Sequence, residues 1–241
     1  MKAGIVGLGV MGRNLALNMR DSGYAVAVTD SWQDARDWHA GGIDVVATKA
    51  ELIGCLLAPR IVLLMVKAGE QVDREIADLA PQLSAGDVVI DGGNSHYRDT
   101  ARRAEELSSR GILYLGAGIS GGAEGARNGA SLMMGGDEAA WSTARDLLTA
   151  VAAKAGDDVP TITRFGDAGA GHFVKMVHNG IEYAIMQAIA ECHGLMRDVG
   201  GLSAPDIAET LERWNTSGRA AGFLLKITAE IVRTGDPHSD G

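Results

Sequence analysis

The sequence predicts an α/β protein in which a doubly wound, mainly parallel sheet is followed by an all-helical segment. Short apolar runs alternate with helix-like segments up to about residue 165, an order typical of parallel sheets covered by helices. Beyond it, helical patterns follow one another at residues 175–197, 205–214 and 221–233. The strands are expected at residues 3–6, 25–29, 61–65, 88–90, 113–115 and 131–134.

The composition describes a folded globular chain and excludes two classes of partner. With 241 residues, 46% of them apolar, the chain suits one large domain or one and a half. Its formal net charge of −9 offers no basic surface for nucleic acid, and its longest apolar run, residues 61–66, is too short to span a bilayer. Two cysteines, Cys55 and Cys192, are too few for a disulfide framework, so we expect buried thiols and a cytoplasmic location.

A glycine motif, Gly7-Leu8-Gly9-Val10-Met11-Gly12, follows the first strand and opens a helix at residues 10–21. Gly7 permits the tight turn, Gly9 lets the backbone approach a pyrophosphate, and Gly12 lets helix and strand pack closely. The helix N-terminus adds positive potential for the phosphates. Strand, glycines and helix together predict a dinucleotide-binding Rossmann unit.

Asp30 ends the second strand, eighteen residues after Gly12. A carboxylate at this place accepts hydrogen bonds from the ribose hydroxyls of NAD and repels the 2′-phosphate of NADP. The following residues, Ser31, Trp32 and Gln33, bring no positive charge to hold an extra phosphate. NAD is therefore favoured over NADP. The other reading, in which Asp30 or Ser31 caps a following helix, stays open.

Two further loops follow strands at the same predicted edge of the sheet. One is residues 91–95, Asp-Gly-Gly-Asn-Ser, and the other is residues 120–125, Ser-Gly-Gly-Ala-Glu-Gly. Both combine small residues with hydroxyl or amide groups, as ligand loops do. Each loop taken alone is equally well a structural glycine turn.

A polar stripe lies within an apolar helical segment near residue 175. Lys175, His178, Asn179 and Glu182 are three, four and seven residues apart, so they share one helix face. Apolar residues around most of the circumference predict a buried helix, which argues against a plain solvated face. His178 and Glu182 could hold a metal at this spacing, but no third ligand is offered nearby, so no metal is expected.

Together the glycine motif, the two loops and the run from His172 to Tyr183 resemble the decarboxylating 6-phosphogluconate dehydrogenases over essentially the whole chain. Related β-hydroxyacid dehydrogenases share the glycine motif, the lysine and the asparagine, but not the histidine and glutamate. The resemblance implies oxidative decarboxylation of 6-phosphogluconate to ribulose 5-phosphate and carbon dioxide, with hydride transfer to NAD, in the pentose phosphate pathway.

The resemblance also implies residue roles. Lys175 matches the general base that takes the proton from the substrate's 3-hydroxyl, and Glu182 matches the acid that protonates C1 of the enediol. Substrate contacts are expected at Asn94, Ser120, Gly121, Gly122, His178, Asn179 and Tyr183, and cofactor contacts at Gly7, Leu8, Gly9, Val10, Met11, Gly12, Asp30, Ser31, Val66, Lys67, Ala68 and Asn94.

The chain departs from the family in two respects. NADP-dependent members carry an Asn-Arg-Thr-like run after the second strand, where this chain has Asp30-Ser31-Trp32, and this reinforces NAD. Members also continue into a long helical region that helps to hold the substrate phosphate. We expect residues 1–168 to form the NAD-binding domain and residues 169–241 only the start of the helical domain, either in a shortened form or in a protein that continues past Gly241.

Cofactor binding should then survive better than catalysis, and a homo-oligomer, dimer or tetramer, is expected. Two other functions stay open. One is a β-hydroxyacid dehydrogenase or reductase that does not decarboxylate and uses Lys175 alone as proton donor. The other is a catalytically silent NAD-binding module.

Overall fold

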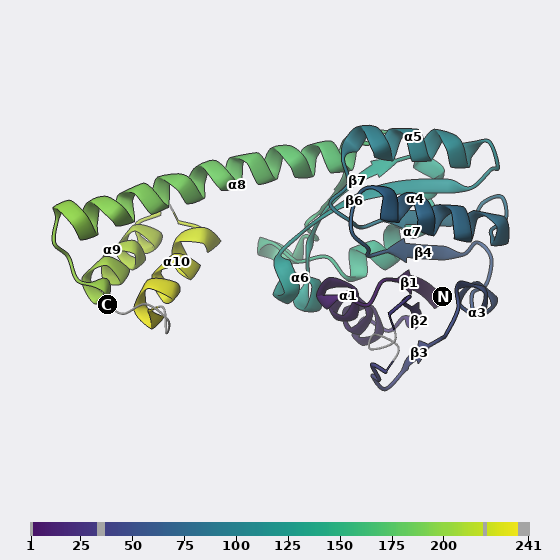
Figure 1. Cartoon of the computed structure of the whole chain (residues 1–241), viewed down its shortest axis with the longest axis horizontal. Helices are drawn as coiled ribbons and strands as arrows, with labels where there is room; N and C mark the ends of the chain where they lie inside the picture. The colour runs from purple at the N-terminus through teal and green to yellow at the C-terminus, as the bar shows by residue number, and fades with distance from the viewer. Residues whose placement is uncertain (1, 33–36, 219–220, 236–241) are drawn as a thin grey trace. The chain divides into compact units, whose positions relative to one another are not determined.

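The computed structural model describes residues 2–32, 37–218 and 221–235. Its first part is one eight-stranded sheet in the order β3-β2-β1-β4-β5-β6-β7-β8. Every pairing is parallel except that of β6 with β7. The predicted α/β fold class is therefore confirmed (Figure 1). The strands are β1 Lys2–Val6, β2 Ala25–Thr29, β3 Ile43–Val45, β4 Ile61–Leu64, β5 Val88–Asp91, β6 Leu113–Ser120, β7 Ser131–Gly136 and β8 Ile162–Arg164.

The predicted strands are all present, but the sequence left two strands out and made one too short. β3 and β8 hold only three residues each and lie at the two edges of the sheet, so neither shows a repeating apolar pattern. The strand expected to end at residue 115 runs on to Ser120 because it pairs with β7 along that length.

Helices cover both faces of the sheet and enclose two apolar cores. In β4 the side chains of Ile61 and Leu63 enter one core and those of Val62 and Leu64 enter the other, because side chains alternate along a strand. The helices of the first core are α1 Val10–Asp21, α6 Gly122–Asn128 and α7 Glu138–Ala150, and those of the second are α3 Lys49–Gly54, α4 Glu70–Leu79 and α5 Tyr97–Ser108.

The strand order reverses at β1, which lies between β2 and β4. The register sets Val6 beside both Thr29 and Leu64, so these three strands end at the same level. Chains leaving parallel strands on opposite sides of such a point open a crevice in which open α/β sheets bind their ligands. The glycine motif, Asp30 and residues 66–68 all follow these strand ends.

The remainder of the chain is helical, as predicted. It consists of α8 Ala170–Gly194, a π-helical turn Leu195–Val199, α9 Ala204–Thr216 and α10 Phe223–Thr234. The chain divides into two compact units, residues 1–176 and 177–241, so α8 begins in the first and ends in the second. The second unit has its own small core of Ile207, Leu211, Leu225 and Ala229. The expected domain boundary after residue 168 stays a prediction.

The prediction that α8 is a buried helix is wrong. Only Gly171 and His172 are buried within it, whereas Phe173 is 45% exposed and Ile181 58% exposed. Apolar residues around a helix indicate that its burial is favourable. They do not show that the residues that would bury it belong to the same chain. Among the described residues, no helix is both long and apolar enough to cross a membrane. The two cysteines are free and half-buried, not fully buried as expected.

A buried arginine connects helices α4 and α5 with the loop that follows β5. Arg103 on α5 is 1% exposed, and its Nε and Nη2 donate to the two carboxylate oxygens of Asp73 at 2.8 and 3.1 Å. Nη2 also donates to the carbonyl of Gly69 at 2.9 Å, and Nη1 reaches the Ser95 Oγ at 3.4 Å. On the same side Nη1 lies 3.5 Å from a carboxylate oxygen of Asp91, which is fully buried. Arg103 thus connects the start of α4 with the loop after β5.

Replacing Arg103 by Met should lower the free energy of unfolding by about 3 to 5 kcal/mol, because the buried Asp91 loses its charged partner. Arg102→Met is the matched control, since Arg102 also binds Asp73 at 2.8 Å but is 45% exposed in its side chain. The control should cost at most about 1 kcal/mol. Urea denaturation measures the free energy of unfolding of both variants. Equal losses would contradict the greater structural importance of Arg103.

Acid should weaken the same connection. The hydrogen bond from Arg103, helped by Arg102, lowers the pKa of Asp73 from 3.8 to about 2. Because the folded pKa is below the unfolded one, this stabilisation is complete above about pH 4 and is lost as the pH falls towards 2. Urea denaturation between about pH 5 and pH 2.5 should show Asp73→Asn less stable at the higher pH, with the difference shrinking in acid. If the difference in stability does not depend on pH, the ionised Asp73 does not stabilise this connection.

Candidate functional site

The glycine turn leaves no room for side chains at two of its three glycines. Gly7 has a φ of +105°, and a Cβ there would lie 2.4 Å from the carbonyl oxygen of Met65. A Cβ on Gly12 would lie 2.0 Å from the carbonyl oxygen of Gly7. A Cβ on Gly9, in contrast, would have no neighbouring atom within 4 Å. Packing therefore explains Gly7 and Gly12, while the space at Gly9 is open to an approaching group.

That space lies where α1 begins. Gly9 is the N-cap residue, no side chain caps the helix, and its first turn carries no acidic residue. The first backbone N–H groups of α1 are thus available to an anion, which suits a pyrophosphate. Val10 is exposed and Met11 half-buried at this end, whereas Leu8 is buried.

Asp30 links the end of β2 to the glycine turn. One carboxylate oxygen accepts the backbone N–H of Leu8 at 2.6 Å, and the other accepts that of Trp32 at 2.9 Å. The carboxylate is half-buried, and Ser31 beside it is exposed. A helix capped by Asp30 or Ser31, the other reading of this place, would fall on residues 33–36, which lie outside the described part of the chain.

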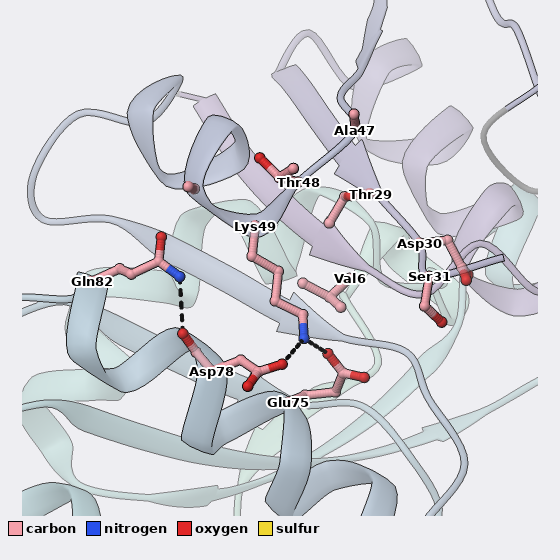
Figure 2. Close-up of a pocket in the computed structure, with 11 residues that line it drawn as sticks. Val6, Thr29, Asp30, Ser31, Ala47, Thr48, Lys49, Glu75, Asp78 and Gln82 are labelled. Carbon is pink, nitrogen blue, oxygen red and sulfur yellow. Dashed lines mark hydrogen bonds and ion pairs between the residues drawn. The ribbon is translucent and has the colours of Figure 1, made fainter. Parts of the chain in front are cut away.

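Two neighbouring cavities flank Asp30. The first, called here the Lys67 cavity, measures about 360 Å³ and is lined by Gly7, Asp30, Val66, Lys67 and Gln71 among others. The second, called the Lys49 cavity, measures about 440 Å³ and extends past Thr29 and Asp30 to Lys49 and Asp78 (Figure 2). The residues that line both are Val6, Asp30, Ser31 and Glu75.

The Lys67 cavity brings together five of the expected cofactor residues at the ends of the strands. Gly7, Asp30, Ser31, Val66 and Lys67 all line it. Ala68 follows directly and is half-buried. The sequence reasoning missed the residues of the cavity walls that come from helices. These are Lys49 on α3 and Gln71, Glu75 and Asp78 on α4, and only the i, i+4 spacing of Gln71 and Glu75 hinted at a shared face.

The loop after β5 packs directly against the residues that follow β4. A Cβ on Gly92 would lie 2.6 Å from the Met65 Sδ, and one on Gly93 would lie 3.0 Å from the carbonyl oxygen of Val66. The Gly93 N–H donates to Asp91 at 3.1 Å. The glycines are thus required for packing, and they set the exposed Asn94 next to residues 65–67.

Glycines in β6 allow the start of α8 to lie on the sheet. A Cβ on Gly118 would lie 2.5 Å from the Lys175 Cβ, and one on Gly171 would lie 2.6 Å from the carbonyl oxygen of Gly116. Lys175 is therefore held against β6, the strand that ends at Ser120. Gly121 and Gly122 follow, exposed, with φ of +131° and +60°.

His172, one turn before Lys175, anchors this end of α8. It is 1% exposed, and its Nδ1 shares a hydrogen bond of 2.7 Å with the Thr100 hydroxyl on α5. Burial lowers the pKa of its imidazole, so the ring is held neutral. The sequence reasoning gave this residue no role of its own, since a single histidine in an apolar segment carries no specific signal.

The other residues of the polar stripe belong to the second unit. The Nδ1 of His178 lies 3.3 Å from a carboxylate oxygen of Glu182 and 3.4 Å from the Asn179 side-chain oxygen. Their side chains are 32% and 37% exposed for His178 and Glu182, and Tyr183 is more open still. The helix thus pairs the imidazole with the carboxylate.

Comparisons with known proteins agree over both parts of the chain. Residues 2–166 match the family model described as the NAD binding domain of 6-phosphogluconate dehydrogenase. Residues 171–241 match that of the 6-phosphogluconate dehydrogenase C-terminal domain.

Curated relatives include decarboxylating 6-phosphogluconate dehydrogenases of Schizosaccharomyces pombe and of Homo sapiens. The first is 47% identical over 236 residues, covering 95% of this chain and 48% of the relative. The second is 46% identical over 238 residues, covering 96% of this chain and 49% of the relative. The chain spans about half the length of the curated relatives it matches.

Two solved structures are also similar. The Plasmodium falciparum 6-phosphogluconate dehydrogenase, studied free, with NADP+ and with 6-phosphogluconate, has a TM-score of 0.91 and 34% identity, covering 100% of this chain and 52% of that one. The Mycobacterium tuberculosis 3-hydroxyisobutyrate dehydrogenase has a TM-score of 0.78 and 27% identity, covering 95% of this chain and 75% of that one. Since family models for both domains match in the right order, the chain belongs to the 6-phosphogluconate dehydrogenase family.

Proposed function

We propose that this chain binds NAD at the crevice beside β1 and belongs to an enzyme that oxidises and decarboxylates 6-phosphogluconate to ribulose 5-phosphate. The observation that carries the proposal is the packing of Lys175 against Gly118, on the strand that ends at Ser120. A proton acceptor thereby lies against the strand that leads to Ser120 and the glycines after it. The family membership supplies the substrate class.

The cofactor half of the proposal rests on the glycine turn and Asp30. The pyrophosphate would lie over Gly9 at the open N-terminus of α1. The Asp30 carboxylate would exchange a backbone partner for the ribose hydroxyls and would repel a 2′-phosphate. The Lys67 cavity would receive the adenosine end. NAD is therefore proposed over NADP.

The chemistry divides between two side chains of α8. Bound NAD supplies the acceptor for the hydride that leaves C3 of the substrate. Lys175 takes the proton of the 3-hydroxyl at the same time and then returns it to the new carbonyl oxygen. A β-keto acid polarised in this way loses carbon dioxide and leaves an enediol. Glu182 protonates C1 of that enediol while the enol hydroxyl returns its proton to Lys175, which leaves the ketone of ribulose 5-phosphate, and no metal is needed.

The remaining expected residues would hold the substrate. Asn94, Ser120, Gly121 and Gly122 present amide, hydroxyl and backbone groups from the two loops of the first unit. His178, Asn179 and Tyr183 present polar groups from α8, Tyr183 towards the phosphate. His178 is already paired with Glu182.

One competing function has a specific observation in its favour. The likeness to a 3-hydroxyisobutyrate dehydrogenase fits a β-hydroxyacid dehydrogenase that uses Lys175 alone and releases no carbon dioxide. That likeness covers 95% of this chain, but at 27% identity, against 34% for the Plasmodium falciparum 6-phosphogluconate dehydrogenase. Release of carbon dioxide from 6-phosphogluconate separates the two functions.

Asp30 should make NAD bind more tightly than NADP by at least about tenfold, because the 2′-phosphate meets a carboxylate. Asp30→Asn should reduce that ratio several-fold, mainly by improving NADP, since the amide oxygen can still accept the Leu8 N–H. Isothermal titration of both nucleotides measures the ratio. NADP binding as tight as NAD in the unchanged chain would refute this account of Asp30.

Lys175→Met should lower NADH formation from 6-phosphogluconate by at least about a hundredfold while NAD binding stays unchanged, because only the proton acceptor is lost. The assay compares this chain with a version extended at its C-terminus, and the control is Lys226→Met, at an exposed position of α10. Full turnover by Lys175→Met in whichever form is active, with carbon dioxide released, would rule out the proposed role.

A further inference from the structure

A buried carboxylate forms part of the wall between the two cavities beside Asp30. Glu75 on α4 is 4% exposed and lines both the Lys67 cavity and the Lys49 cavity. One of its oxygens lies 2.5 Å from the Lys49 Nζ, and the other accepts a hydrogen bond from the Gln71 side chain. Figure 2 shows Lys49 reaching across from α3 to this carboxylate.

Lys49 does not neutralise the cavity. Its Nζ also lies 2.7 Å from a carboxylate oxygen of Asp78, so one ammonium is shared between two carboxylates. Burial acts to lower the pKa of Lys49, but Asp78 and Glu75 together hold it above its ordinary value. The ammonium is thus committed to these two carboxylates on α4 (Figure 2).

The charges around the proposed ribose position are therefore mainly negative. Asp30, Glu75 and Asp78 line the Lys49 cavity against the single ammonium of Lys49. The Lys67 cavity adds only Lys67, whose side chain is exposed. Among the described residues that line either cavity there is no arginine, the side chain best suited to hold a phosphate with two hydrogen bonds.

We propose that Glu75 is a second residue, besides Asp30, that determines the choice of NAD over NADP. This inference rests on the proposed binding of NAD at Asp30. The Glu75 carboxylate repels a 2′-phosphate across the cavity wall, and it keeps Lys49 engaged so that the ammonium does not move to that phosphate. The adenosine and ribose of NAD carry no charge at this place and are therefore little affected.

A purely structural ion pair is the competing explanation of Glu75. Buried ion pairs often contribute little net stability, so the burial of this one does not by itself require a stabilising role. The two explanations differ in what they expect of the nucleotides. A structural pair affects NAD and NADP alike, whereas a selective carboxylate affects NADP alone.

The test is the variant Glu75→Gln, which keeps the size of the side chain and a hydrogen-bond acceptor for Lys49. Isothermal titration with NAD and with NADP gives the two dissociation constants. We expect NADP to bind about five- to twentyfold more tightly than to the unchanged chain, corresponding to about 1 to 2 kcal/mol, and NAD to change less than about twofold.

Asp78→Asn is the matched control, because Asp78 binds the same ammonium but is 65% exposed and lines only the Lys49 cavity. Its effect on the NADP to NAD ratio should stay within about twofold, since solvent screens an exposed charge. Glu75→Met, similar in length and uncharged, serves if the glutamine variant does not fold, with the same expected gain for NADP.

Parallel changes of both dissociation constants in Glu75→Gln or Glu75→Met would overturn the inference, as would an equal gain in Asp78→Asn. If the chain discriminates as expected but neither it nor the version extended at its C-terminus forms NADH from 6-phosphogluconate, only the proposed function is contradicted. A chain that binds neither nucleotide contradicts both.

Discussion

Backbone segments meet at the turn between β1 and α1 with no space for a side chain between them. Gly7 touches the carbonyl of Met65 at the end of β4, and Gly12 lies over Gly7 itself. A methyl group at either position would push α1 away from the sheet. This close approach fixes where α1 begins relative to the ends of the neighbouring strands.

Charged side chains from elsewhere in the sequence hold the surrounding loops in position. Asp30 holds the glycine turn by accepting the Leu8 N–H, and Arg103 holds the start of α4 and the loop after β5. These loops lack regular backbone pairing, and hydrogen bonds from the half-buried Asp30 and the buried Arg103 take its place. Removing a carboxylate and a guanidinium from water costs free energy. Hydrogen bonds offset that cost only when every partner is present.

Glycines on the sheet also position the proposed base, because they let a helix approach a strand closely. Gly116 and Gly118 of β6 have no side chains, so the first turns of α8 lie directly on the strand and Lys175 is pressed against it. His172, buried and bonded to Thr100, prevents this end of the helix from turning. The proposed base is therefore positioned by residues that have no proposed part in the reaction.

Four features could be predicted from the sequence: the alternation of strands and helices, the glycine turn, the acidic end of β2 and the polar stripe of α8. Each depends on residues close together in the chain, so spacing and residue type are enough to reveal it. The sequence could not show the antiparallel β7, the short edge strands or the exposure of α8. The ion pairs of Glu75 with Lys49 and of Arg103 with Asp73 and Asp91 become visible only in the folded structure. Such pairs join separate helices and strands, and packing of the whole sheet brings them together without leaving any spacing in the sequence.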